Sequence, residues 1–259
     1  MNHPTHVLIT GAAGAIGAAI AREMRGAWPK ARLALLDREA DSMTVLAASL
    51  GNASTHGADL RDIDALPGVV AAIENHAPLD GLVNCAGIMQ VRDVQSWEWD
   101  AAAALVAVDL LAPLRLQDLV VRSIVKANAT GGVVINISSM AGKVPLKGCA
   151  YYGASKAGLA MASEIARADL APIGIRVVTV YPGPVRSALE QGARDAYGGG
   201  GLFGRFAPTG DPAELARRIL SALDRDEPRV IYPRLYGVGW TAPNLSSWIT
   251  LSYGPPPVN

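Results

Sequence analysis

The chain has 259 residues, half of them hydrophobic by count, and its 23 basic and 23 acidic side chains leave no formal net charge. This length supports one large core, so a single domain spanning residues 1–259 is the simplest expectation. The balanced charge, without any block of like charges, excludes the basic footprint of a nucleic-acid-binding protein and predicts a small molecule as the partner.

Several features bear on where the protein works. The polar segment 1–6 lacks the charged and apolar regions of a signal peptide, and no apolar run reaches the roughly 20 residues that span a membrane. Cys85 and Cys149 lie in segments predicted to be buried, which is typical of free thiols in a reducing compartment. The four histidines show no spacing that would build a metal site. A cytoplasmic protein without a metal is therefore predicted.

Short apolar strands alternate with helical segments along most of the chain. The predicted strands cover 6–10, 32–36, 55–58, 81–84, 133–138, 175–180 and 229–232, and the predicted helices cover 15–25, 42–50, 63–76, 97–128, 152–170 and 212–223. Nearly continuous apolar strands between helices indicate a parallel sheet covered on both faces. The predicted fold is a doubly wound α/β (Rossmann) domain with strand order 3-2-1-4-5-6-7 and a ligand crevice at the carboxyl ends of its strands.

Two segments depart from this alternation. Residues 188–210 follow the sixth strand and contain the glycine run 198–201. Loops at this edge of an open α/β sheet border the ligand crevice, so the segment is predicted to be a mobile substrate lid, with an ordinary surface loop as the alternative. The tail, residues 233–259, is too apolar to stand free in water and is predicted to pack on this subunit or on a neighbour.

A glycine-rich turn joins the first strand to the first helix. Gly11, Gly14 and Gly17 are the three glycines, and Ala15 and Ile16 lie between the last two. Missing side chains permit a tight turn and the close approach of a pyrophosphate to the amides at the start of the helix. Such a turn predicts a dinucleotide site only when other motifs accompany it.

An acidic residue supplies the second half of this signal. Asp37 follows the second strand, 20 positions after Gly17. A carboxylate there accepts hydrogen bonds from both hydroxyls of the adenosine ribose and repels a 2′-phosphate. The pattern therefore predicts NAD as the cofactor, although Arg38 could shield a phosphate and leaves NADP as the alternative.

Three further residues point to proton chemistry. Tyr152 and Lys156 are four residues apart on a predicted helix and so share one face. A nearby ammonium stabilises a phenolate and moves the pKa of the phenol from about 10 toward neutral pH. Ser139, at the end of the fifth strand, would lie at the carboxyl edge of the sheet and could hold the substrate oxygen. When each motif is considered alone, the alternative for Tyr152 and Lys156 is an exposed pair on a helix, and the alternative for Ser139 is a residue that caps a turn.

Together these motifs, with Asn84-Cys85-Ala86-Gly87 after the fourth strand, resemble the short-chain dehydrogenase/reductase family over roughly residues 6–187. The resemblance implies that Ser139 orients the substrate, that Tyr152 is the acid/base, and that Lys156 activates Tyr152 while binding the nicotinamide ribose. The other cofactor-side residues that the resemblance implies are Asp59, Leu60, Asn84, Ala86, Gly87, Pro182, Gly183, Val185 and Ser187.

The sequence departs from the family pattern at two positions. Ala15 stands where single-domain members usually have glycine, and the resulting glycine spacing is more typical of larger epimerase-like members. Asp109 stands where many members have an asparagine that supports a proton relay to the lysine. An ionised carboxylate cannot donate a hydrogen bond, and its charge would stabilise Lys156 as a cation, so an altered pH dependence is expected.

The sequence thus predicts an enzyme that transfers a hydride between NAD and a secondary alcohol or ketone carbon of an unidentified small molecule. The resemblance also implies a homodimer or homotetramer formed through the helices that contain Asp109 and Tyr152. Two hypotheses remain as alternatives. One is a non-catalytic NAD-binding regulatory or scaffolding protein. The other is a sugar-nucleotide epimerase or dehydratase, for which the chain after Ser187 is short.

Overall fold

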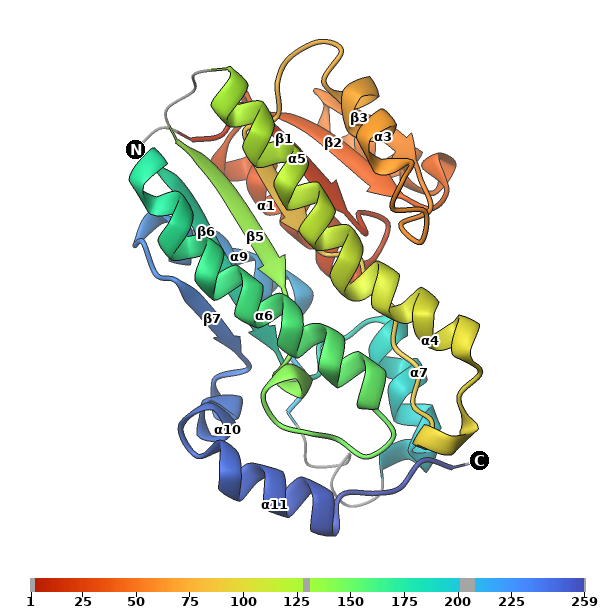
Figure 1. Cartoon of the computed structure of the whole chain (residues 1–259). Coiled ribbons are helices and arrows are strands. Elements are labelled where there is room, and N and C mark those ends of the chain that lie inside the picture. The colour runs from red at the N-terminus through yellow and green to blue at the C-terminus, as the bar shows by residue number, and fades with distance from the viewer. Residues whose placement is uncertain (1–2, 128–130, 201–207, 259) are drawn as a thin grey trace.

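The computed structural model describes residues 3–127, 131–200 and 208–258. Seven parallel strands form one sheet in the order β3-β2-β1-β4-β5-β6-β7 (Figure 1). The strands are β1 (His6–Thr10), β2 (Arg32–Asp37), β3 (Ala53–Gly57), β4 (Gly81–Asn84), β5 (Gly132–Ile137), β6 (Ile175–Pro182) and β7 (Arg229–Tyr232). The sheet confirms the predicted doubly wound fold and its strand order.

Strands β2 and β3 lie on one side of β1, and all later strands, from β4 to β7, lie on its other side. Val7 of β1 lies opposite Leu33 of β2 on one side and Gly81 of β4 on the other. Every residue of β1 and of β4 is buried. Because the connections leave in opposite directions from such a switch point, the carboxyl ends of the strands open into a crevice there.

Helices cover both faces of the sheet (Figure 1). Apolar side chains of α1, α2 and α9 form one core with the sheet, and those of α3 and α5 form a second core on the opposite face. The helices are α1 (Ala15–Ala27), α2 (Thr44–Leu50), α3 (Leu66–Ile73), α4 (Trp99–Val106), α5 (Ala112–Lys126), α6 (Ala150–Leu170), α7 (Ala188–Ala196), α9 (Pro212–Asp224), α10 (Gly237–Thr241) and α11 (Pro243–Tyr253).

The segment predicted as one helix over 97–128 is interrupted. It consists of α4, a π-helical turn (Ala107–Leu111) and α5. Pro113 has no N–H to donate to the carbonyl of Asp109 four residues earlier, so the regular α-helical ladder cannot continue past this point. Asp109 lies in the wider turn, and such turns are frequent at functional sites.

The segment predicted as a substrate lid is partly helical. Ser187 caps α7, because its hydroxyl accepts a hydrogen bond from the N–H of Glu190. A short 3-10 turn follows at Gly198–Gly200. The next part of the predicted lid, residues 201–207, lies outside the described residues. The mobility of the lid stays a prediction.

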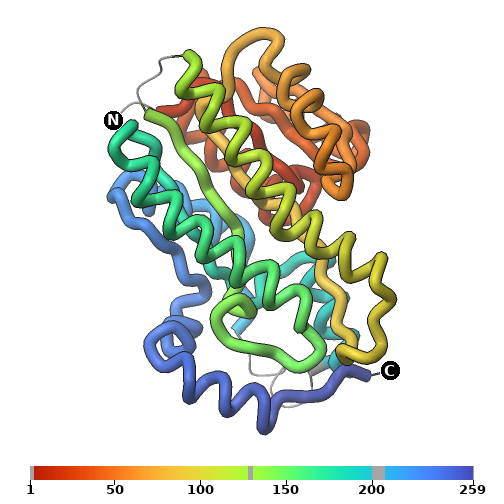
Figure 2. Tube along the Cα trace, in the orientation of Figure 1, coloured from red at the N-terminus to blue at the C-terminus, as the bar shows by residue number. Residues whose placement is uncertain are grey.

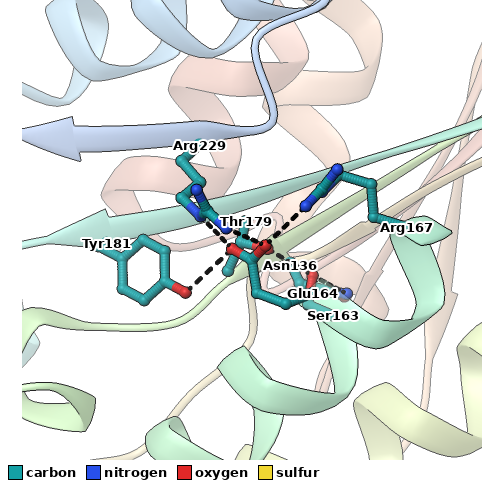
Figure 3. A network of polar contacts seen from close by, with 7 residues as sticks. All are labelled: Asn136, Ser163, Glu164, Arg167, Thr179, Tyr181 and Arg229. Atoms are coloured by element: carbon teal, nitrogen blue, oxygen red, sulfur yellow. Dashed lines mark hydrogen bonds and ion pairs between the residues drawn. The ribbon is translucent and has the colours of Figure 1, made fainter.

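Buried polar side chains join α6 to the neighbouring strands (Figure 3). Asn136 of β5 donates to the hydroxyl of Ser163 at 3.0 Å, and Thr179 of β6 donates to the same hydroxyl at 2.8 Å. All three residues are almost fully buried. Because each buried polar group has a partner, these bonds hold α6 in one position against the sheet.

Glu164, next to Ser163, links α6 to the far edge of the sheet (Figure 3). Its carboxylate accepts hydrogen bonds from Arg229 of β7 at 2.6 Å and from the hydroxyl of Tyr181 of β6 at 3.3 Å. Partial burial alone would raise the pKa of Glu164, but Arg229 and Arg167 outweigh burial and hold the pKa below its usual range. Glu164 is therefore ionised in this network at neutral pH.

Candidate active site

A crevice with a volume of about 1610 Å³ lies at the carboxyl ends of the strands, lined by segments that follow β1 to β6 and by α7 and the tail. All but one of the predicted cofactor-side residues line it. Those that do are Gly11, Gly14, Ala15, Ile16, Gly17, Asp37, Arg38, Asp59, Leu60, Ala86, Gly87, Tyr152, Lys156, Pro182, Gly183, Val185 and Ser187. Asn84 is the exception.

The glycine turn after β1 forms a tightly packed cradle. Gly11 has φ +65°, and a Cβ added there would lie 2.7 Å from the backbone of Ala86. A Cβ on Gly17 would lie 2.2 Å from the carbonyl oxygen of Gly11. Gly14 at the N-cap has no side chain to occupy the first amides of α1. These amides suit an anionic pyrophosphate, so the residues present fit a dinucleotide.

Two carboxylates line the crevice where β2 and β3 end. The Asp37 carboxylate accepts hydrogen bonds from the N–H of Ala13 at 3.0 Å and of Arg38 at 2.8 Å, which fix its orientation. The side chain of Arg61 hydrogen-bonds Asp59 and lowers the pKa of that carboxyl to about 2. Arg61 also lines the crevice, although sequence reasoning missed it; its place two residues after Asp59 was the available signal.

Asn84 supports the crevice from behind instead of lining it. Its side-chain amide donates to the carbonyl of Pro113 at 3.1 Å and to Asn136 at 2.8 Å, so it ties β4 to α5 and β5. The hydroxyl of Thr10 accepts a hydrogen bond from the N–H of Ala86 and so joins the ends of β1 and β4. Both contacts shape the crevice wall without presenting a side chain to it.

The structure brings Ser139, Tyr152 and Lys156 together at the edge of the sheet. All three line the crevice, and their exposed fractions are 8%, 7% and 4%. Tyr152 and Lys156 share one face of α6, with the Lys156 ammonium 5.8 Å from the centroid of the Tyr152 ring. The Ser139 hydroxyl accepts a hydrogen bond from the N–H of Ala141, so this serine also caps the turn after β5. The three residues predicted from the sequence to perform proton transfer therefore meet in one place.

Asp109 lies directly behind Lys156. One carboxylate oxygen accepts a hydrogen bond from the N–H of Ile88 at 2.8 Å, and the other lies 3.5 Å from the Lys156 ammonium. The ammonium also donates to the carbonyl of Ile137 at 3.3 Å. Asp109 is fully buried and does not line the crevice. Its contacts toward the site are therefore with Lys156 and with the loop after β4.

Comparison with known protein families identifies the chain. Residues 5–198 match the family model described as short chain dehydrogenase. The chain belongs to this family. This short-chain dehydrogenase is an NAD(P)-dependent oxidoreductase that acts on CH–OH groups. The family resemblance inferred from the motifs is confirmed.

Known relatives and solved structures agree with this assignment. A D-threitol dehydrogenase of Mycolicibacterium smegmatis is 32% identical, over 81% of this chain and 82% of that protein. A trans-4-hydroxycyclohexanecarboxylate dehydrogenase of Sinomonas cyclohexanicum is 35% identical, but the match spans only 61% of this chain and 60% of that protein. The structure of a short-chain dehydrogenase from Sphingobium yanoikuyae in complex with NADPH has a TM-score of 0.75 at 27% identity, covering 96% of this chain and 95% of that one.

The electrostatics of this short-chain dehydrogenase depart from one sequence-based expectation. Burial raises the pKa of Tyr152; Lys156 opposes this, whereas the charge of Asp109 adds to it. The sequence predicted that the pKa of the Tyr152 phenol would move toward neutral pH. For the protein without a cofactor this prediction is wrong, because the loss of hydration outweighs the attraction of the Lys156 ammonium. Sequence position reveals the nearby cation but not the extent of burial.

Lys156 and Asp109 form a buried, unlike-charged pair. Burial alone would lower the pKa of Lys156, but the nearby Asp109 and Tyr152 outweigh it and the pKa is raised, so Lys156 remains an ammonium. Burial raises the pKa of Asp109 although Lys156 and the N–H of Ile88 oppose it. Each partner thus favours the charged form of the other, while burial opposes both charges.

The part of the chain that the structure describes contains neither a membrane-spanning helix nor a cluster of metal-binding side chains. None of its helices is long and apolar enough to cross a membrane. None of its His, Cys, Asp and Glu side chains gather into a group that could hold a metal ion. The two cysteines are free thiols, and a cytoplasmic location stays a prediction.

Proposed function

We propose that this short-chain dehydrogenase transfers a hydride between NAD and the carbon of a secondary alcohol or ketone. The observation that carries the proposal is the burial of Ser139, Tyr152 and Lys156 together, in the same crevice as the glycine cradle. When bound, the nicotinamide supplies the carbon that accepts or releases the hydride. The chain's own residues then have to bind the cofactor, hold the substrate oxygen and move one proton.

Binding of the cofactor is assigned to the segments after the strands. The cradle around Gly14 would hold the pyrophosphate, and Lys156 would bond the nicotinamide ribose. The segment 182–187 would contact the nicotinamide carboxamide. Asp37 accepts hydrogen bonds from the adenosine ribose, and its charge repels a 2′-phosphate, so NAD is preferred to NADP.

Movement of the proton is assigned to Tyr152. The Ser139 hydroxyl donates a hydrogen bond to the substrate oxygen and so positions it beside the phenol. In oxidation the Tyr152 phenolate accepts the hydroxyl proton of the substrate, while the hydride from the carbon would pass to bound NAD; in reduction both transfers would reverse. The Lys156 ammonium stabilises the phenolate and opposes the effect of burial on its pKa.

The test is the absorbance of reduced nicotinamide when the purified protein meets NAD or NADP and a panel of secondary alcohols. The names of the relatives favour cyclic alcohols and sugar alcohols for this panel. Reduction of NAD is expected. If no alcohol of the panel led to reduction of NAD or NADP, and NAD binding were demonstrated separately, the non-catalytic NAD-binding alternative would be favoured. A cofactor retained through purification would favour the epimerase-like alternative.

Asp109 is proposed as a positioning residue that acts through Lys156. Its negative charge raises the pKa of both Tyr152 and Lys156. Asp109→Asn is therefore expected to lower the pKa that governs kcat/KM for alcohol oxidation, so that the profile shifts to lower pH. The measurement is kcat/KM against pH for both proteins. Superimposable profiles would remove Asp109 from the proton chemistry.

We also propose a homodimer or homotetramer formed through α5, α6 and the π-helical turn before α5. Apolar side chains are exposed on these elements, with Leu111 45%, Val125 55%, Met161 65% and Ile165 54% exposed. An assembly would remove this surface from water. Light scattering is expected to show a dimer or tetramer, and a monomer at all working concentrations would contradict the proposal.

The helix α7 forms the first part of the segment predicted as a substrate lid. Leu189 and Ala193 on this helix line the crevice, as does Tyr197 directly after it. We propose that α7 borders the bound substrate on one side. Its apolar residues would exclude water from the reacting atoms.

A further inference from the structure

We propose that residues 237–258, here called the strap, form a wall of the substrate site and make it select uncharged, apolar secondary alcohols and ketones. The inference rests on the proposed function, because it assigns a substrate class to the same crevice. The relevant part of the crevice is its substrate end, formed by α4, the loop after β5, α7 and the strap. Figure 2 shows the strap, in blue, crossing the end of the molecule toward the cyan segment that contains α7.

The first part of the strap is anchored through an aromatic side chain. The Trp240 ring packs edge to face on Tyr181, with 4.7 Å between the ring centroids. The Lys143 ammonium lies 4.9 Å and the Arg229 guanidinium 5.5 Å from the centroid of the same ring. Arg229 is itself held by Glu164 (Figure 3). Edge-to-face and cation–π contacts together fix α10 beside the ends of β6 and β7.

The middle and the end of the strap are held by hydrogen bonds. Thr250 of α11 donates to the carbonyl of Pro145 at 2.7 Å, and Lys147 donates to the carbonyl of Gly254 at 3.0 Å. The N–H of Val258 donates to the carbonyl of Ala196, the last residue of α7, at 2.9 Å. The strap therefore spans from the sheet to α7 and is attached at both ends and in between.

One face of the strap lines the crevice, and the other face is exposed to solvent. Val238, Ile249 and Thr250 line the crevice, as do Met140 and Val144 after β5. Met140 directly follows Ser139, and a Cβ added to Gly239 of the strap would lie 3.3 Å from the Met140 side chain, so the strap begins beside the loop that carries the residue assigned to the substrate oxygen. By contrast, Leu245 and Leu251 of α11 are about half exposed and do not line the crevice. Only the inner face can contact a substrate.

The charged side chains at the substrate end are largely engaged with the protein. Glu190 and Arg194 of α7 form an ion pair at 2.6 Å, and Lys147 is bonded to the strap at Gly254. Asp100 adds a negative charge at the start of α4. A carboxylate-bearing substrate would have to displace one of these bonds and lose its own hydration. An uncharged substrate gains apolar contact with the strap at no such cost.

The experiment compares substrates that differ in one feature at a time. Mandelate is 1-phenylethanol with a carboxylate in place of the methyl group, and 1-(2-naphthyl)ethanol is the same alcohol with a larger ring system. We expect kcat/KM with NAD for 1-phenylethanol to exceed that for mandelate at least tenfold. In Ile249→Ala, kcat/KM for the naphthyl alcohol is expected to rise about tenfold relative to 1-phenylethanol, because side-chain volume in an apolar pocket controls which substrates fit.

Leu251→Ala is the matched control, since it removes an aliphatic side chain from the outer face of the same helix. It should leave both ratios unchanged, and Kd for NADH should be the same in all three proteins. Equal substrate ratios in Ile249→Ala and Leu251→Ala would overturn the assignment of the strap as a wall. A preference for mandelate would overturn the substrate class.

A binding measurement separates this inference from the proposed function. 2-Acetonaphthone with NAD⁺ cannot react, so its binding to the three proteins can be measured by calorimetry without turnover. Tighter binding to Ile249→Ala than to Leu251→Ala would support the strap even if no alcohol were oxidised, in which case only the proposed function would fail. Equal binding, or no binding to any of the three proteins, would overturn the inference.

Discussion

Replacing Tyr152 by phenylalanine is expected to lower kcat for alcohol oxidation by about 10²- to 10⁴-fold, the range that a positioned general acid or base contributes. The change removes one oxygen and keeps the ring, which packs with Leu105, Ala141 and Cys149. Binding of NADH, measured by fluorescence titration, and thermal stability should therefore change little. A fall in kcat without a loss of cofactor affinity would identify Tyr152 as the group that moves the proton.

Tyr151→Phe is the control for this prediction. Tyr151 is the neighbouring residue of α6, does not line the crevice, and packs edge to face on Trp97 with 5.1 Å between the centroids. The same loss of a phenolic oxygen there should leave kcat near that of the native enzyme. Equal losses in the two variants, or a Tyr152→Phe protein that keeps native turnover, would contradict the assignment of Tyr152.

Asp37→Ala is expected to raise kcat/KM for NADP relative to NAD by about two orders of magnitude. The native carboxylate would place a negative charge beside the 2′-phosphate, and a like-charge contact of this kind costs several kcal/mol. Removal of the carboxylate also exposes the phosphate to Arg38 and Arg61, which line the same part of the crevice. Arginine suits phosphate because of its planar set of donors.

The measurement is kcat/KM for both cofactors at a fixed, saturating concentration of one alcohol. Asp41→Ala is the matched control, because Asp41 is an exposed carboxylate of the same region that does not line the crevice. Both variants change the net charge equally, so only a local effect can distinguish them. If the two variants kept the same cofactor preference, Asp37 would not select between NAD and NADP.

Much of the cofactor side of the site follows from local sequence. Gly11, Gly17 and Asp37 lie at the ends of β1 and β2 or just beyond them, and the carboxyl ends of parallel strands meet at one edge of the sheet. Knowing the strands therefore predicts that these residues converge. Tyr152 and Lys156 meet for a similar reason, since residues four apart share a face of any helix. In each case a short stretch of sequence and a regular element specify the geometry.

The remaining features depend on contacts between distant segments. Asn84 follows the family motif, but its bonds to Pro113 and Asn136 turn it away from the crevice. The pKa of Tyr152 is raised because several elements bury it together, a quantity that sequence spacing does not measure. The complete burial of Asp109 has the same origin.

The C-terminal tail shows most directly which features follow from the sequence and which depend on tertiary contacts. Its composition predicts that it packs on protein, because large apolar side chains are costly to expose. Which surface it covers depends on Trp240 meeting Tyr181 and on Val258 reaching Ala196, contacts that form only once the sheet and α7 are in place. The sequence by itself thus determined the fold, the glycine cradle and the pairing of Tyr152 with Lys156 on one helix face. The tertiary structure alone decided which segments line the other end of the crevice, since α7 and the tail are far apart in the chain from most of the strands whose ends they meet.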